Sequence, residues 1–545
     1  MSIRDEIRVW FDLDKKAFSC FATGSPALGI ASSTAALEVD GVVLRADKAT
    51  RADCEGLSAE GEIGKGGRAV IVFTFGQPPV VWRVEASVTD DGGSALLGSE
   101  ITNKSDGEVT LGKCRLLDVS PGAGKVVLGP DKGDLAFLEC WGTQRQTRVR
   151  RAAENDGRHL TKIIAHLYNP SQPLALHAGF VTYDRANTEH AFSYQQGQGV
   201  QELRCYCDFD GFTLKPGASI RSETLLIELQ SNPYRSLERW ADRVQAHYQP
   251  RIWPGTPAGW VGWSWVDGFN VERYEDVVLR NARALKRRLD GFGIEYIWVS
   301  IGNLKDGLPG NWLEFSAENF PSGVEALVAE LSKLGLKLGF WVAPFWICSH
   351  LKDKVEQFKD ALLRKPDGSL LVTRSEWQYG AAGKLPKGQR PVCYALDGSY
   401  PKTVEWLKRV FSTYRKWGIR YYMIDFLEAG SGSTPGAHVY GDYHDRRLVK
   451  GPEVYRNALK AVREAAGEDT YLLASSGPTL HDVGLVDAVR TGNDYGEGRA
   501  LYPDTYFYPA TFVINSAGYW TSHAHASNNM AATYFTHRKL YVNDS

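Results

Sequence analysis

From about residue 256 onward, short apolar runs alternate with amphipathic stretches, and this alternation constrains the fold more than any other feature. "GWVGWSWVD", "IEYIWVSIG" and "LKLGFWVAPF" are each followed by a helix-like segment, and "IRYYMIDF" leads through a long loop to "GPEVYRNALKAVREAAG". "TYLLASSG", "VDAVRTGND" and "ATFVINSAG" follow, before a last helix-like run, "NNMAATYFTHRKLYV". Apolar strands separated by amphipathic helices indicate parallel strands buried on both faces. Seven such strands in about 290 residues favour a (β/α)8 TIM-type barrel over an open sheet.

The first 230 residues have a different pattern. "RAVIVFTF", "VVWRVEASV" and "TLLIEL" are β-branched or alternating runs separated by turns such as "DDGG" and "KSDG", which predicts an antiparallel β-sandwich. Between the two regions, Leu237, Trp240, Val244 and Tyr248 recur at helical spacing. We therefore predict a multidomain β and α/β chain: an N-terminal β-sandwich domain over 1–231, a helical linker over 232–255 and a catalytic barrel over 256–545. No eighth strand fits before Ser545, so we expect the barrel to be truncated at its C-terminal end.

Charge and cysteine usage exclude several classes of partner. Lys and Arg total 63 against 64 Asp and Glu, a balance that argues against nucleic acid or an acidic membrane surface as the main partner. The N-terminus lacks the apolar centre of a signal peptide, and no apolar run reaches the roughly 20 residues of a membrane helix. Eight scattered cysteines suggest reduced thiols, so we expect a cytoplasmic protein without membrane association.

Two carboxylates stand where strands of such a barrel end. Asp425 closes "IRYYMIDF", and Asp494 closes "VDAVRTGND" four residues after Arg490. Reactive groups in this type of barrel lie at the C-terminal ends of the strands, and most glycoside hydrolases use a pair of carboxyl groups in catalysis. A strand-end aspartate can equally be a cap for the following helix, so neither residue is decisive alone.

A family resemblance supports the catalytic interpretation. "GWVGWSW" at 259–265, "FPSGVEALVAELSKLGLKLGFWVAP" at 320–344, "ASSGP" at 474–478 and "RTGND" at 490–494 occur in the order typical of clan D glycoside hydrolases. The chain resembles the retaining α-galactosidases of families 27 and 36, and its large N-terminal β region resembles family 36 in particular. Members of that family carry a smaller C-terminal β domain after the barrel, and they are often oligomers, which leaves a homo-oligomer open here.

The resemblance implies roles for individual residues. It makes Asp425 the nucleophile and Asp494 the acid/base, which would place the two carboxyl groups roughly 5–6 Å apart. Arg490 matches an arginine that orients the sugar near its 2-position. The remaining implied substrate-binding positions are Ser475 and Ser476 in the loop after strand five, Trp263 and Trp265 at the start of the barrel, and Trp312 in "GNWLEF"; Trp341 is a further aromatic candidate near a strand end.

Two departures from the family pattern affect the sugar pocket. Clan D galactosidases usually have Asp-Asp-Gly-Trp after strand two, whereas this chain has "IWVSIGNLKDG", with Ser300 and Ile301 in place of the acids. Asp306 is the nearest carboxylate that could substitute from the loop. Met423 stands where family 36 usually has a lysine two residues before the nucleophile. Because a site loses selectivity when its hydrogen-bonding partners are missing, the identity of the glycone is open.

The expected function is a retaining α-glycoside hydrolase, most closely like an α-galactosidase, acting on an α-linked oligosaccharide or glycoside. N-acetylgalactosamine, glucose or a transglycosylation like that of raffinose synthases remain alternatives. A carbohydrate-binding relative without catalysis is the alternative from another class. The glycine-rich segments lack the Lys-Ser/Thr step of a phosphate loop, and the His and Asp residues of 438–445 lack regular ligand spacing, so we expect no cofactor and no metal.

Overall fold

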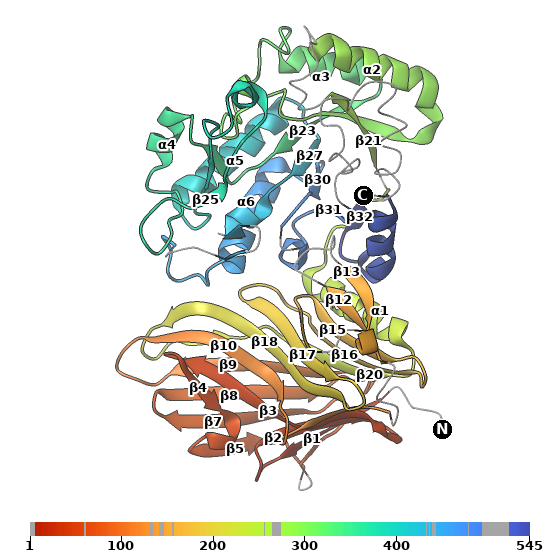
Figure 1. Cartoon of the computed structure of the whole chain (residues 1–545), viewed down its shortest axis with the longest axis vertical. Helices are drawn as coiled ribbons and strands as arrows, with labels where there is room; N and C mark the ends of the chain where they lie inside the picture. Colours follow the sequence, from red (N-terminus) through yellow and green to blue (C-terminus); the bar gives the residue numbers. More distant parts are fainter. Residues whose placement is uncertain are drawn as a thin grey trace. The chain divides into compact units, whose positions relative to one another are not determined.

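The computed structural model divides the chain into two compact units (Figure 1). One unit comprises Met1–Gln249, Thr491–Leu540 and Ser545, and the other comprises Pro250–Arg490 and Tyr541–Asp544. The structure describes residues 6–58, 61–129, 135–140, 147–154, 157–255, 257–263, 274–431, 433–434, 437–438, 443–477, 479–492 and 523–544. Within these ranges, no helix combines the length and the hydropathy that crossing a bilayer requires.

The first unit contains two antiparallel sheets of ten strands each (Figure 1). The first sheet has the order β14-β17-β18-β10-β3-β2-β1-β6, and β4 and β11 both pair with β3. Its strands are β1 (Ile7–Asp12), β2 (Ala17–Ala22), β3 (Ser25–Val39), β4 (Val42–Arg45), β6 (Glu62–Ile63), β10 (Val109–Val119), β11 (Lys125–Leu128), β14 (Gly157–Thr161), β17 (Asn187–Gln195) and β18 (Gly199–Leu214).

The second sheet has the order β13-β12-β15-β16-β20-β9-β8-β7-β5, with β19 beside β9. Its strands are β5 (Arg51–Glu55), β7 (Arg68–Gly76), β8 (Pro79–Val88), β9 (Ala95–Asn103), β12 (Ala136–Cys140), β13 (Thr147–Arg151), β15 (Ile164–Asn169), β16 (Leu174–Phe180), β19 (Ser219–Arg221) and β20 (Leu225–Gln230). β7 and β8 alternate strictly between buried and more exposed residues, as expected for a sheet with one face in the core.

Aromatic side chains from the two sheets meet in the core of this unit. Phe11 of β1 lies 6.4 Å from Phe73 of β7, and Phe137 of β12 lies 5.0 Å from Phe192 of β17, measured between ring centroids. The Oγ atom of Ser99 in β9 lies 3.4 Å from the Sγ atom of a cysteine in β10. The side chains at alternate positions of these strands therefore pack against those of the other sheet, as the alternation of apolar and polar residues in the sequence indicates.

Helix α1 (Pro233–Tyr248) belongs to this first unit. It begins at Asn232, whose side chain accepts a hydrogen bond from the backbone N–H of Tyr234 at 3.0 Å, and a proline occupies its first turn. The indole of Trp240 is fully buried and donates to the Phe180 carbonyl of β16 at 2.7 Å. The apolar face read from the sequence is thus the face that docks on the sheet.

The second unit is built on a seven-stranded parallel sheet with the order β21-β22-β23-β27-β30-β31-β32 (Figure 1). Its strands are β21 (Ala258–Trp263), β22 (Ile294–Val299), β23 (Lys337–Val342), β27 (Tyr421–Ile424), β30 (Tyr471–Ala474), β31 (Ala488–Arg490) and β32 (Val542–Asp544). The helices between them are α2 (Tyr274–Leu289), α3 (Val324–Lys333), α4 (Lys352–Phe358), α5 (Pro401–Lys416) and α6 (Pro452–Ala466). Sequential strands lie side by side and run parallel, as the strand–helix alternation predicts.

The C-terminal part of this sheet differs from the sequence prediction. The apolar run at 510–518, predicted as the seventh strand, lies outside the described residues. The seventh strand of the sheet is instead β32, which pairs in parallel with β31. The predicted helix-like run at 528–542 is α-helical only to residue 532, a 3-10 turn follows at Tyr534–Thr536, and its last residue already belongs to β32. β32 was not recognised in the sequence because three residues are too few to display a period.

Two small sheets flank the parallel one. β24 (Trp346–Cys348), β25 (Val372–Arg374) and β26 (Cys393–Ala395) form a three-stranded antiparallel sheet with β26 in the middle. β28 (Ser433–Thr434) and β29 (Ala437–His438) form a hairpin. The three-stranded sheet lies in the connections that follow β23 and carries residues that contact the candidate site.

Candidate functional site at the ends of the parallel strands

Asp425 lies on the core-facing side of the parallel sheet, one residue beyond β27. Residues two apart in a strand share a face, and Tyr421 and Met423 both pack in the cluster that fills the inside of this sheet. The ring of Tyr421 lies 5.0 Å from that of Tyr296 and 5.7 Å from that of Tyr471, between centroids. The Asp425 backbone N–H donates to the Val342 carbonyl at 2.8 Å. The strand pairing thus continues to Asp425 and fixes which way its side chain faces.

Both carboxylate oxygens of Asp425 accept a hydrogen bond. The indole Nε1–H of Trp341 donates to Oδ2 at 3.0 Å, and the backbone N–H of Phe426 donates to Oδ1 at 2.9 Å. Phe426 has a φ of 51°, a left-handed conformation that is uncommon for a bulky residue and typical of strained functional turns. Asp425 itself remains half-buried. The result is an oriented carboxylate that a ligand can still reach.

An aromatic cluster surrounds this carboxylate. The ring of Trp346 stacks on that of Phe426 at 4.1 Å with an interplanar angle of 19°. Trp341 stacks on Trp377 at 5.9 Å and lies 6.1 Å from Trp312, between centroids. The Trp377 indole donates to a carbonyl in the loop after β22 at 2.9 Å. Trp341 and Trp312, two of the predicted substrate-binding residues, lie together in this cluster, and both are buried, at 4% and 1% exposure. Trp377 was missed because its loop, "SEWQYG", has no periodic signal.

Serines after β30 connect the loops that follow β27 and β30. Ser476 Oγ donates to Glu428 Oε2 at 2.9 Å and accepts the backbone N–H of Leu427 at 3.2 Å. Ser475 is buried, and its Oγ accepts a hydrogen bond from Arg490 Nη1 at 3.4 Å. The structure thus places Ser475, Ser476 and Arg490 at neighbouring strand ends beside Asp425, because β27, β30 and β31 are adjacent in the sheet.

The loop after β22 does not bring Asp306 into this group. Asp306 lies in a 3-10 turn with φ 59° and ψ 5°, and its side chain is exposed. No hydrogen bond or ion pair joins its carboxylate to another of the described residues. Ser300, where the family pattern has an acid, is buried, and Ile301 has a φ of 61°. The backbone is left-handed at both Ile301 and Asp306, so the direction of the Asp306 side chain does not follow from its spacing in the sequence.

Three predicted site residues cannot be placed beside Asp425. Asp494 and Trp265 lie outside the described residues. The backbone of Trp263 forms the end of β21 and pairs with Val299, but its side chain is not among those described. The expected separation of Asp425 and Asp494 therefore stays a prediction.

Asp544 is a strand-end carboxylate that sequence reasoning did not identify. It closes β32 and is the register partner of Arg490 in the parallel pair. Its negative charge contributes to raising the pKa values of Tyr421 and Tyr471, which burial raises first. The strand register aligns Ile424, Ala474, Val489 and Asn543, which are the residues directly before Asp425, Ser475, Arg490 and Asp544. Asp544 therefore lies near Tyr421 and Tyr471, at the same end of the sheet as Asp425. The only sequence signal was the apolar "LYV" before it, which we assigned to a helix.

A buried carboxyl also lies behind the loop after β30. Burial raises the pKa of Asp482 to about 8, although the Tyr455 hydroxyl donates to it at 2.5 Å. Asp482 is almost fully shielded from solvent, so this group supports the loop and does not contact a ligand. Among the described residues, no group of three or more His, Cys, Asp or Glu is placed to hold a metal ion.

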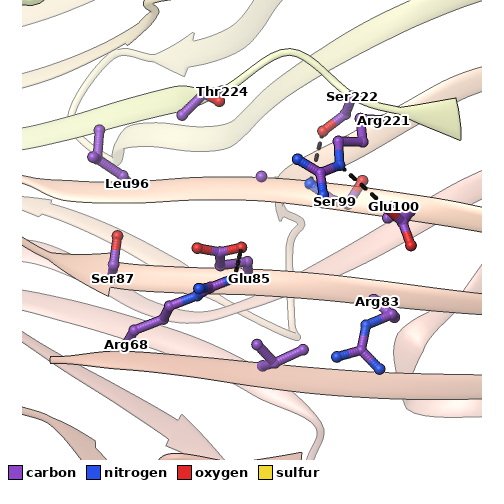
Figure 2. Close-up of a pocket in the computed structure, with 12 residues that line it drawn as sticks. Arg68, Arg83, Glu85, Ser87, Leu96, Ser99, Glu100, Arg221, Ser222 and Thr224 are labelled. Atoms are coloured by element: carbon purple, nitrogen blue, oxygen red, sulfur yellow. Dashed lines mark hydrogen bonds and ion pairs between the residues drawn. The ribbon is translucent and has the colours of Figure 1, made fainter.

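A separate groove lies on the outer face of the second sheet in the first unit (Figure 2). It has a volume of about 440 Å³ and is lined by side chains of β7, β8, β9 and β19. Two of its arginines are paired with glutamates, Arg68 with Glu85 at 2.6 Å and Arg221 with Glu100 at 3.2 Å. These pairs are exposed, and neither resembles the oriented carboxylate of Asp425.

Comparison with known proteins gives one consistent result. No family model matches the chain. Among solved structures, the α-galactosidase of Thermus thermophilus bound to p-nitrophenyl α-D-galactopyranoside is similar over 80% of this chain and 80% of that one, with 19% identity and a TM-score of 0.50. A family 36 α-galactosidase variant of Geobacillus stearothermophilus bound to stachyose is similar over 95% of this chain and 67% of its own, with 13% identity and a TM-score of 0.57. The α-galactosidase of Lactobacillus brevis is similar over 98% and 72%, with 13% identity and a TM-score of 0.57. At these identities the likeness concerns the fold, and in its fold this chain resembles the α-galactosidases of glycoside hydrolase family 36.

Proposed function

We propose that this protein is a retaining α-glycoside hydrolase of the α-galactosidase type. The observation that carries the proposal is the Asp425 carboxylate, oriented by Trp341 Nε1 and the Phe426 N–H at the end of the fourth strand of a parallel sheet. The likeness in fold to α-galactosidases supports it. The proposal includes the architecture: a β-sandwich over 1–231, a connector over 232–255 and a (β/α)8 barrel from 256.

In the proposed mechanism Asp425 attacks the anomeric carbon. The glycosidic C–O bond breaks, the departing oxygen takes a proton from Asp494, and a β-linked glycosyl-enzyme forms. Asp494 then removes a proton from water, whose oxygen displaces Asp425 and restores the α configuration. Arg490 would hold the sugar near its 2-position, where a hydrogen bond that tightens in the transition state lowers the barrier.

The aromatic cluster suits a sugar substrate. Apolar C–H faces of sugars pack on aromatic rings, and Trp312 and Trp341 lie on the strand-end side that carries Asp425. We assign these two, together with Trp263, Trp265, Ser475 and Ser476, to substrate binding. The structural neighbours include complexes with stachyose and with a nitrophenyl α-galactoside, so α-linked oligosaccharides are the proposed substrates. Ser300 in place of an acid favours testing other glycones as well.

The test compares Asp425→Asn with Asp290→Asn on a panel of nitrophenyl α-glycosides. Asp290 is a suitable control because its side chain is exposed and, among the described residues, pairs only with Lys286 of the preceding helix turn. We expect Asp425→Asn to abolish turnover with the fold intact, and Asp290→Asn to leave turnover unchanged. Turnover of one sugar by the unaltered protein names the glycone. Failure to turn over any of them would favour a carbohydrate-binding relative without catalysis.

A second measurement separates a nucleophile from a structural carboxylate. In Asp425→Gly the missing carboxylate leaves space for an external nucleophile, so added azide should restore turnover and give a β-glycosyl azide. With the unaltered enzyme, the first product formed should have the α configuration. A β product would contradict double displacement, and substantial hydrolysis by Asp425→Asn would exclude Asp425 as the nucleophile.

A further inference from the structure

Two cysteines face each other next to the aromatic cluster. Cys348 ends β24, and Cys393 begins β26; the two strands are antiparallel, and these residues are register partners. Both side chains are fully shielded from solvent, and both are free thiols. They are 45 positions apart in the chain, so their meeting is a result of the fold.

The hydrogen-bond pattern shows which kind of pair they form. In the same register, the Leu396 N–H donates to the Phe345 carbonyl and the Ser349 N–H donates to the Val392 carbonyl, each at 2.9 Å. Phe345–Leu396 and Ser349–Val392 are therefore hydrogen-bonded pairs. Because hydrogen-bonded and non-hydrogen-bonded pairs alternate along antiparallel strands, the pair next to Ser349–Val392, which is Cys348–Cys393, is a non-hydrogen-bonded pair. Consistent with this, the Cys348 N–H donates elsewhere, to the Pro309 carbonyl. Such pairs have Cα atoms about 4.5 Å apart, within the range of about 4.4–6.8 Å that a disulfide spans.

The two thiols differ in pKa, although a positive charge acts on each, that of Lys352 on Cys348 and that of Arg374 on Cys393. A hydrogen bond from the Cys393 thiol lowers the pKa of Cys348, and the nearby positive charge of Lys352 acts in the same direction. Burial raises the pKa of Cys393 well above its usual value. Cys348 is thus the better thiolate, and Cys393 is the thiol placed to resolve a mixed disulfide.

We propose that Cys348 and Cys393 form a reversible disulfide by exchange with a low-molecular-weight disulfide. The Cys348 thiolate attacks one sulfur of the oxidant, which releases one small thiolate and leaves a mixed disulfide on Cys348. Cys393 then loses its proton and attacks the Cys348 sulfur, which releases the second small thiolate. Overall, two protein thiols are oxidised to one disulfide, and one small disulfide is reduced to two thiols.

The bond would fasten the sheet that supports the aromatic cluster. Trp346 lies two residues before Cys348 in β24 and stacks on Phe426, the residue after Asp425. Arg374 of β25, which pairs with the same central strand, lies over the Phe426 ring at 5.9 Å. Because the register already suits the bond, we expect it to restrict opening of this sheet without moving the ring stack. Its effect on turnover, unlike its formation, rests on the proposed function.

A second pair of facing cysteines provides an internal control. Cys114 and Cys207 are register partners in β10 and β18 and are also buried. Burial raises the pKa of Cys114 to about 12 and that of Cys207 well above its usual value, and no positive charge opposes this at either thiol. This pair should remain reduced under conditions that oxidise Cys348 and Cys393, because neither thiol forms the thiolate that exchange requires.

The experiment incubates the intact protein with 2-hydroxyethyl disulfide, then alkylates the remaining thiols under denaturing conditions and maps the peptides by mass spectrometry. We expect a linked peptide pair containing residues 348 and 393, lighter by two hydrogens and cleaved by dithiothreitol, and no linked pair containing 114 and 207. Cys54, which is only partly buried, reports that the oxidant has reacted. The oxidised protein should unfold at a temperature higher by several degrees, a gain that Cys393→Ser cannot show.

The outcomes decide the proposal independently of the enzymatic activity. If Cys54 is modified while Cys348 and Cys393 remain fully alkylated, the proposal is wrong. Equal oxidation of Cys114 and Cys207 would also overturn the reasoning, because burial without a cation would then be no barrier. In a nitrophenyl glycoside assay, the oxidised protein should keep its turnover and lose it at a higher temperature than the reduced protein. Loss of turnover with the bond formed would refute the claim that the ring stack stays in place.

Discussion

Replacing Asp487 by Asn should destabilise the second unit strongly, although Asp487 lies far from the strand ends that carry Asp425. Asp487 directly precedes β31, and its side chain is 1% exposed. Its Oδ2 atom accepts hydrogen bonds from Arg463 Nη2 at 2.5 Å and from the Leu472 N–H at 2.8 Å. Its Oδ1 atom accepts one from Arg251 Nε at 3.1 Å. One carboxylate therefore holds two arginines and the first residues of two neighbouring strands.

The expected magnitude follows from the burial of the partner. The side chain of Arg463 is only 10% exposed, and burial already lowers its pKa against the opposing charge of Asp487. Asn is nearly the same size as Asp but carries no charge, and its NH₂ group would face a guanidinium. Leaving a buried charge without its partner costs about 3–5 kcal/mol. Asp469→Asn is the matched control, because its two arginine contacts at 3.0 Å are half exposed and should be worth about 0–1 kcal/mol.

Urea unfolding followed by hydrogen-exchange mass spectrometry can measure the loss of stability separately for the second unit. Peptides that contain β30 and β31 should lose protection at a lower urea concentration in Asp487→Asn, because the single side-chain oxygen of Asn cannot accept from Arg251 on one side and from Arg463 and Leu472 on the other. Peptides of the two antiparallel sheets provide the reference. A loss below about 1 kcal/mol, or a loss no larger than that of Asp469→Asn, would show that the arginines find other partners and would refute the argument.

Two further predictions concern pH and the candidate site. Burial lowers the pKa of His166 to about 4, of His190 to about 3 and of His177 well below its usual value. Because the unfolded chain binds these protons below about pH 6.5, the free energy of unfolding of the first unit should fall from about pH 6.5 towards pH 4, by up to about 1.4 kcal/mol per pH unit for each histidine. The urea midpoint should fall with it, and a flat profile would contradict this. Trp341→Phe keeps an aromatic ring but removes the indole N–H that donates to Asp425, so kcat/KM on a nitrophenyl α-glycoside should fall about 10- to 100-fold. The control Trp417→Phe, at the end of α5, should leave kcat/KM unchanged. Equal losses in both variants would indicate a packing effect.

The sequence predicted the order of strands in the parallel sheet because each strand is a compact apolar run next to a helix with a clear apolar face. Six of the seven strands fall within the predicted runs, and their adjacency follows from chain order. β32 escaped because its three residues are too short to show a period, and because the segment before it begins as a helix. The antiparallel strands were recognisable as strands, but pairings such as β3 with β10 and β11 join segments far apart in the chain. A local pattern does not specify such partners.

The candidate site was predictable only as far as strands determine it. Asp425 was identified because it ends an apolar run, and Arg490 because "RTGND" resembles a family motif. Alternation along a strand fixes the side of the sheet on which each lies. The direction of the Asp306 side chain could not be predicted from spacing, because it depends on a left-handed turn that exposes this side chain. Trp377 was missed because its position depends on a hydrogen bond to a distant loop. Residues on long loops are positioned by contacts with distant parts of the chain. Such contacts leave no periodic pattern in the sequence, so only the three-dimensional structure shows which loop residues belong to the candidate site.

Met423, two residues before Asp425, carries no charge, so the positive charges near Asp425 come from other elements. Met423 packs with the aromatic core, so the layer beneath Asp425 on its own strand is apolar. The cations that the structure brings to neighbouring positions come from other elements: Arg490 from β31, through Ser475, and Arg374 from β25, over the ring of Phe426. A guanidinium is planar and donates in fixed directions, whereas an ammonium acts as a point charge. If these arginines take over the role of the lysine, recognition of the substrate depends on the three-stranded sheet that carries Arg374 as well as on the parallel strands. The register of Cys348 with Cys393 would then bear directly on the pocket, because both cysteines belong to that small sheet.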